Sequence, residues 1–141
     1  MDAKEYLRQA YRLDQKIRSD MIEVARLREM SMSISAPSLG EKVQTGRQSD
    51  APYTRCVEKM LALEEKIDEE MGILVSLKEQ MRGVIAAVPD ADEQMVLRFR
   101  YIHNMTWERI GNEMNANART VRRWHGAALL HVSLPKNPIK I

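Results

Sequence analysis

The chain has 141 residues, enough for one domain or for a domain with an appendage. Its 22 Lys and Arg residues against 20 Asp and Glu residues give a formal net charge of +2, and 44% of the residues are apolar, a composition typical of folded proteins. A single cysteine excludes an internal disulfide framework, and the absence of any run of about 18 apolar residues argues against a membrane-spanning helix.

The first predicted element is a helix over about residues 2–30. Its apolar side chains recur at steps of three and four residues, which places them on one helical face. This stripe consists of Tyr6, Ala10, Leu13, Ile17, Met21, Val24 and Leu27. The opposite face is charged and includes Arg8. Residues 31–51 are rich in Ser, Gly and Pro and have no apolar period, so we expect a flexible connection there.

A second long helix is predicted over about residues 52–88, with Pro52 in its first turn. Ten steps lead from Tyr53 to Val88, a distance of 35 positions, so the mean step is 3.5 residues, the period of a coiled coil. The stripe consists of Tyr53, Val57, Met60, Leu63, Ile67, Met71, Leu74, Leu77, Met81, Val84 and Val88. The sequence favours an antiparallel helical hairpin, formed within one chain or between two. We expect Glu69 and Glu70 on the solvated side.

Three short helices are predicted after the break at Pro89, over about residues 90–101, 107–114 and 118–131. Thr106 and Asn117 are the expected N-caps of the second and third of these helices. No segment has a strand pattern. The predicted fold class is therefore all-α, with a hairpin arm at 1–88, a three-helix module at 89–132 and a tail at 133–141.

Residues 105–124 have the layout of a helix-turn-helix. We expect Asn115 to adopt a left-handed conformation at the turn, and Gly111 to permit a close approach. The inward positions are Ile110, Met114, Val121 and Trp124, whereas Arg119, Arg122 and Arg123 face outward. A second helix of this kind enters the major groove of DNA, where arginine pairs with guanine edges or with phosphates.

Residues 84–132 resemble region 4 of sigma-70-type sigma factors, which reads the promoter −35 element. The pattern comprises Val88-Pro89, the run 96–101 (VLRFRY), the run 105–111 (MTWERIG), the run 120–122 (TVR) and the run 127–129 (AAL). The resemblance places Asn117, Arg119, Thr120, Arg122 and Arg123 at DNA-facing positions, and Thr106 completes the set of candidate DNA-binding residues. Asn104 and Asn115 stand where the family often has glycine. Ala118 and Arg119 also depart from primary sigma factors, so we expect a different base sequence to be read.

The whole chain resembles phage and prophage late-transcription regulators of the ArpU/RinA-like type, which join a helical N-terminal part to a sigma-like helix-turn-helix. The resemblance implies a sequence-specific DNA-binding regulator in the bacterial cytoplasm. Its partners would be double-stranded DNA, a second copy bound through the arm, and RNA polymerase. We expect no membrane association.

The sequence predicts no catalytic residue, cofactor or metal site, and therefore not an enzyme. His103, His125 and His131 lack the spacing of metal ligands, and Cys56 is expected to be inert. Trp107 and Trp124 match core positions of the module, so we expect packing rather than base stacking. A phosphate contact by His125 is the weaker alternative to a structural role.

Two other functions remain open. The first is a factor that docks on RNA polymerase with little DNA affinity of its own. The second is the DNA-recognising small subunit of a phage packaging terminase. The charge distribution favours DNA binding by the C-terminal module, because residues 1–89 hold 14 basic and 15 acidic residues whereas residues 90–141 hold 8 and 5.

Overall fold

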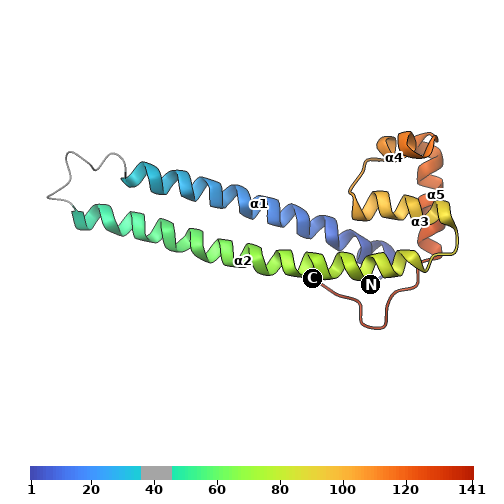
Figure 1. The fold of residues 1–141 in the computed structure, drawn as a ribbon, viewed down its shortest axis with the longest axis horizontal. Coiled ribbons are helices and arrows are strands. Elements are labelled where there is room, and N and C mark those ends of the chain that lie inside the picture. Colours follow the sequence, from blue (N-terminus) through green and yellow to red (C-terminus); the bar gives the residue numbers. More distant parts are fainter. Residues whose placement is uncertain (36–45) are drawn as a thin grey trace. The chain divides into compact units, whose positions relative to one another are not determined.

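A computed structural model describes residues 1–35 and 46–141, with side chains at 1–33 and 51–141 (Figure 1). Its elements are α1 (Ala3–Ser35), α2 (Gly46–Ala86), α3 (Ala91–Leu97), the π-helix η2 (Arg98–Ile102), α4 (Trp107–Met114) and α5 (Ala118–Leu130). The described residues contain no strand, which confirms the predicted all-α class. None of the described helices is long and apolar enough to cross a membrane.

The two long helices extend further than predicted. A capping box begins α1, because the Glu5 N–H donates to Asp2 Oδ1 (2.8 Å) and the Asp2 N–H donates to Glu5 Oε2 (3.0 Å). The helix continues to Ser35, and α2 begins at Gly46, so Pro52 lies inside α2 rather than in its first turn as predicted. Part of the predicted connection is thus helical, and its residues 36–45 lie outside the described residues.

The chain divides into two compact units. Unit 1 contains residues 1–14 and 73–141, and unit 2 contains residues 15–72. The predicted arm at 1–88 is therefore split, because the first turns of α1 and the last turns of α2 pack with the C-terminal helices. The buried cluster that joins them is Tyr6, Leu7, Ala10, Leu77, Met81, Val84, Ile85, Val88, Leu97, Tyr101, Ile102 and Ala128.

Two glutamines fix the predicted tail at 133–141 to unit 1. The Gln9 side chain donates to the carbonyl of Ile139 (2.8 Å) and accepts from the N–H of Ile141 (2.9 Å). Gln80 likewise donates to the carbonyl of Asn137 (3.0 Å) and accepts from the N–H of Ile139 (3.0 Å). Ile139 packs on the buried cluster, so these residues form part of unit 1.

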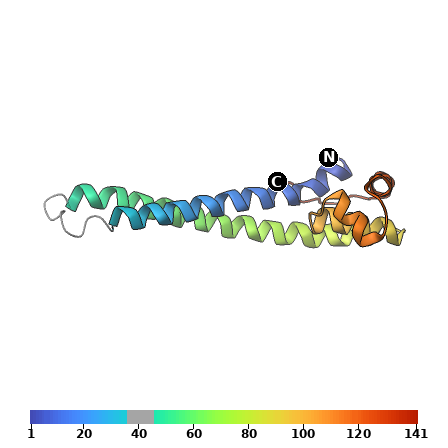
Figure 2. The same ribbon diagram turned by 90° about the horizontal axis from the view of Figure 1, so that it is seen from above.

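Unit 2 is an antiparallel pair of helical segments from α1 and α2 (Figures 1 and 2). An ion pair joins Arg28 to Glu64 at 3.1 Å, and the Cys56 thiol donates to the carbonyl of Leu27 at 3.0 Å. The hairpin thus forms within one chain.

The inner line of unit 2 differs from the predicted apolar stripe at Tyr53, which is 42% exposed, and at the level of Met21 and Met71. Met21 and Met71 are exposed (53% and 47%), whereas Asp20 and Glu70 are buried (9% and 6% exposed). Each acid precedes its methionine by one residue and so lies about 100° around the helix from it. A stripe drawn through the most apolar residues therefore does not follow the packed face of the helices at this level. The prediction that Glu70 is solvated was wrong.

The two buried carboxyl groups lack donors. Asp20 Oδ2 and both oxygens of Glu70 have no hydrogen-bond partner, and Lys16 Nζ is 3.7 Å from Glu70 Oε2. Burial raises the pKa of Glu70, and the neighbouring Asp20 raises it further, against the lowering effect of Lys16 and Lys66. A proton held by Glu70 would allow the two carboxyl groups to hydrogen-bond to each other.

Candidate nucleic-acid interface

The turn between α4 and α5 has the conformation expected from its sequence. Thr106 caps α4 by accepting from the N–H of Arg109 (3.2 Å), and Asn117 caps α5 by accepting from the N–H of Thr120 (2.7 Å). Asn115 ends α4 in the left-handed region, with φ 54° and ψ 46°. Asn104 is also left-handed, with φ 54°, at the other position where the resemblance to sigma region 4 leads one to expect glycine.

Gly111 sits where the chain passes closest to α4. A Cβ atom at this position would collide with the backbone carbonyl oxygen of Ala116, in the turn itself. The Ala116 N–H donates to the carbonyl of Gly111 at 2.9 Å, which holds the turn against the helix. The close approach predicted for Gly111 is thus confirmed, although its partner is the turn rather than the second helix.

A separate small core lies beneath the turn. Val96, Ile110 and Val121 are its buried members, and they join α3, α4 and α5. The side chains packed around them are Phe99, Met105, Trp107, Met114, Ala116 and Trp124. The predicted packing roles of both tryptophans are confirmed.

The side chains of the predicted DNA-facing residues differ in their exposure and in their hydrogen bonds. Arg119, Arg122 and Arg123 are exposed on α5. Thr106 and Asn117 are exposed too, but their side-chain oxygens serve as helix caps. Thr120 is half-buried. The three arginines are therefore the side chains most able to reach bases or phosphates.

His125 is buried in unit 1, with 8% of its surface exposed. Its Nε2 lies 2.6 Å from the hydroxyl of Tyr101, and its ring meets the Trp107 ring edge-on at 4.7 Å between centroids. Burial lowers the pKa of His125 to about 4, and the charges of Lys4 and Arg100 add to this effect. The imidazole is neutral at physiological pH, so it has the predicted structural role.

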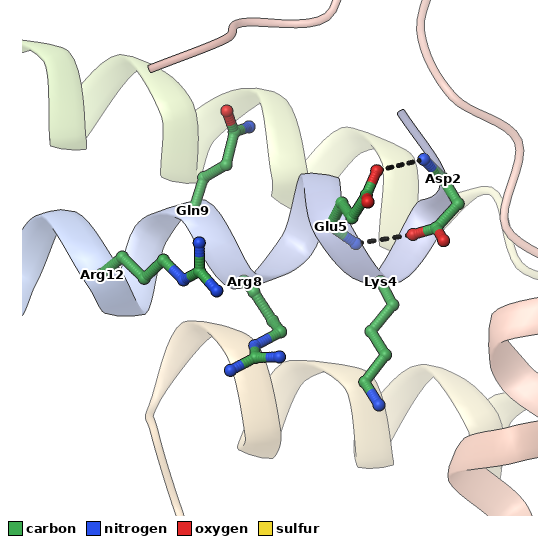
Figure 3. Close-up of a pocket in the computed structure, with 6 residues that line it drawn as sticks. All are labelled: Asp2, Lys4, Glu5, Arg8, Gln9 and Arg12. Atoms are coloured by element: carbon green, nitrogen blue, oxygen red, sulfur yellow. Dashed lines mark hydrogen bonds between the residues drawn. The ribbon is translucent and has the colours of Figure 1, made fainter.

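A cleft of about 570 Å³ lies beside the helix-turn-helix, within unit 1. Its lining includes Lys4 and Arg8 from α1, Arg100 from η2, and Thr106 and Arg122 from the helix-turn-helix. Figure 3 draws a second pocket that shares Lys4 and Arg8 with this cleft and is also lined by Asp2, Glu5, Gln9 and Arg12. The Lys4 and Arg8 side chains extend in the same direction from α1, opposite to Gln9 (Figure 3). Arg8 was predicted on a charged solvated face, and Lys4 was not singled out, because no local pattern links α1 with residues about 100 positions later.

A comparison with protein families gives one match, to a family described as "Protein of unknown function (DUF722)", over residues 10–128. The chain belongs to the DUF722 family. No curated protein and no solved structure is significantly similar to it. The match covers the hairpin as well as the helix-turn-helix, so both are parts of the DUF722 unit.

Proposed function

We propose that this DUF722 protein is a sequence-specific DNA-binding transcription regulator of phage origin that acts in the bacterial cytoplasm. The observation that carries the proposal is the capped α4–turn–α5 arrangement with three exposed arginines on the N-terminal half of α5. A helix-turn-helix uses the first residues of its second helix to contact base edges. Arg119 and Arg123 would contact bases, and Arg122 would hold a phosphate.

Exposed apolar side chains on unit 2 support self-association through the hairpin. They are Met21, Ile22, Met30, Met32, Tyr53, Leu61 and Met71. Such side chains gain free energy when a second surface removes them from water. A two-fold dimer would present two copies of α5 to half-sites about one helical turn apart, and RNA polymerase is the other partner we propose for this surface.

Binding-site selection on random DNA, followed by a mobility-shift assay on the selected sequence, tests the proposal. The wild-type protein should enrich a defined sequence and bind it with an affinity that falls steeply with salt. The double variant R119A/R123A should lose at least tenfold in specific affinity, because each bidentate base contact contributes about 1–3 kcal/mol. Unchanged specific binding by this variant would contradict the assignment of the two arginines.

The same samples separate the two rival functions. Retention of RNA polymerase by a protein that selects no DNA sequence would favour a polymerase-docking factor. Ring-sized oligomers in light scattering would favour a terminase small subunit. The sigma-like order of motifs on α3, α4 and α5 supports the regulator over both.

A further inference from the structure

Four basic side chains from three separate elements line the cleft of unit 1. Lys4 and Arg8 lie one turn apart on α1, Arg100 lies in η2 and Arg122 lies on α5. None of the residues that line the cleft is acidic. Unneutralised positive charges repel one another, so the arrangement favours an anion between them.

Arg100 is held in place before any ligand arrives. Its guanidinium donates to the carbonyl of Met105 (2.9 Å), and its Cζ lies 4.2 Å from the centroid of the Trp107 ring. Lys4, Arg8 and Arg122 are exposed at the cleft and free to adjust to a ligand. A fixed guanidinium with three adjustable cations suits phosphate oxygens, which arginine binds with paired hydrogen bonds and lysine as a point charge.

The electrostatic effect of these side chains is already visible on their neighbours. After burial, the largest influences on the pKa of His125 are the charges of Lys4 and Arg100, and both lower it. Arg100 and Arg8 act in the same sense on the Tyr101 hydroxyl, whose pKa burial raises. Tyr101 and His125 are hydrogen-bonded neighbours on the cleft wall, so both effects reflect the positive charge of the same part of the cleft.

The position of the cleft identifies the source of the phosphate. Thr106 caps the N-terminus of α4, and Arg122 lies one turn along α5 from Arg119, on the part of the helix that we propose enters the major groove. We propose that the cleft holds phosphates of the DNA backbone at the edge of that groove, and that Lys4 and Arg8 extend the DNA interface onto α1. This inference rests on the proposed function and enlarges it, because α1 lies outside the helix-turn-helix.

The double variant K4Q/R8Q tests the inference. The selected DNA site and a scrambled site are each titrated at several salt concentrations. We expect the affinity for both to fall about tenfold, and the slope of log K against log salt to become shallower by 1 to 2, because each phosphate contact contributes a slope of about 0.9. The base preference stays unchanged, since phosphate contacts carry no sequence information.

The matched control is R26Q/K59Q, which removes the same charge from exposed positions of unit 2. It should retain the wild-type salt slope. Circular dichroism melts of both variants show whether each remains folded. The Lys4 and Arg8 side chains are exposed, so their replacement should leave the fold intact.

Three outcomes would overturn the inference. If K4Q/R8Q matches the control in affinity and slope while the wild type binds its selected site, α1 takes no part in DNA binding, and the proposed function stands. If inorganic phosphate raises the melting temperature of the wild type but not of K4Q/R8Q, and DNA binding is unaffected, the cleft binds a free anion instead. If the wild type binds no DNA, both the inference and the proposed function fail.

Discussion

The two units of the molecule use the same kind of helix but bury it differently. In unit 1, Leu77 and Met81 of α2 are fully buried because α1, the C-terminal helices and the chain end surround them. In unit 2, α2 packs with α1 alone within the chain, and the best-buried apolar side chain of its α2 segment, Cys56, remains 6% exposed. A helix with several partners buries apolar side chains completely, whereas a two-helix pair buries only a narrow line.

This difference explains why polar groups are tolerated in unit 2. Asp20 and Glu70 lie on its inner line with carboxyl oxygens that have no hydrogen-bond partner. The buried polar side chains Glu93 and His125 of unit 1 are instead hydrogen-bonded, to His131 and Tyr101. The hydroxyl of Tyr6 donates to Gln80 at 2.8 Å, so it is satisfied. We therefore expect unit 1 to respond to changes in shape, and unit 2 to changes in charge.

The largest expected effect comes from adding a methyl group to the tightest point of unit 1. G111A should lower the free energy of unfolding by about 2 to 3 kcal/mol, because the new Cβ would collide with the Ala116 carbonyl and force the turn away. Urea denaturation followed by circular dichroism measures the change.

G83A is the matched control in unit 1. Nothing lies within 4 Å of a Cβ at Gly83, which is inside α2, so this variant should gain up to about 1 kcal/mol from helix propensity. Equal effects of the two substitutions would show that the turn adapts and that unit 1 is not the tightly packed region.

Removing the buried charge of Glu70 in unit 2 is expected to change the free energy of unfolding by a smaller amount and in the opposite direction. E70Q should raise the free energy of unfolding by about 1 kcal/mol at pH 7, since it removes a buried carboxylate without donors. The pKa of Glu70 is higher in the folded protein than the value of 4.5 in the unfolded chain. Protonation of Glu70 therefore stabilises the fold fully below pH 4.5, and this stabilisation is lost as the pH rises through the folded pKa.

The gain from E70Q should therefore vanish near pH 4, where the wild-type carboxyl group is protonated as well. E69Q provides the control, because Glu69 is exposed one position away. Denaturation curves at pH 4 and pH 7 measure both variants. A destabilising E70Q at pH 7 would mean that the ion pair with Lys16 outweighs the burial of the charge.

The smallest expected effect concerns the one buried histidine of unit 1. The pKa of His125 is lowered from 6.5 to about 4, so its contribution to stability is complete above pH 6.5 and is lost as the pH falls towards 4. An NMR titration should show the His125 ring still neutral at pH 5. K4Q should raise this pKa, because Lys4 lies among the charges that lower it. A midpoint near 6.5 in the wild type would contradict the burial of the ring.

The parts predicted correctly from the sequence depend on neighbours in the chain. The caps at Thr106 and Asn117, and the left-handed Asn115, follow from hydrogen bonds and backbone preferences within four residues. The all-α class and the packing of Trp107 and Trp124 followed from the apolar periods and from the resemblance to sigma region 4.

The parts that were missed depend on contacts between distant segments. Lys4, Arg8 and Arg122 line the same cleft only because α1 packs beside the C-terminal helices. No sequence pattern in α1 indicates that packing. The burial of Glu70 depends on which face of α2 meets Asp20, which differs by one residue from the most apolar line. The boundary predicted at residue 88 likewise reflects local sequence, whereas the units reflect contacts.

The glutamine bridges to the chain end also determine the order in which the protein can be completed. Gln9 bonds to Ile139 and Ile141, so unit 1 closes between segments synthesised about 130 residues apart. All residues of unit 2 lie between the two segments of unit 1 and are synthesised by position 72. On the ribosome, the hairpin of unit 2 is able to form while α1 still lacks the partners of Tyr6 and Leu7. Unit 1, which carries the proposed DNA-binding surface, is thus completed only after residues 137–141 have been synthesised, later than unit 2.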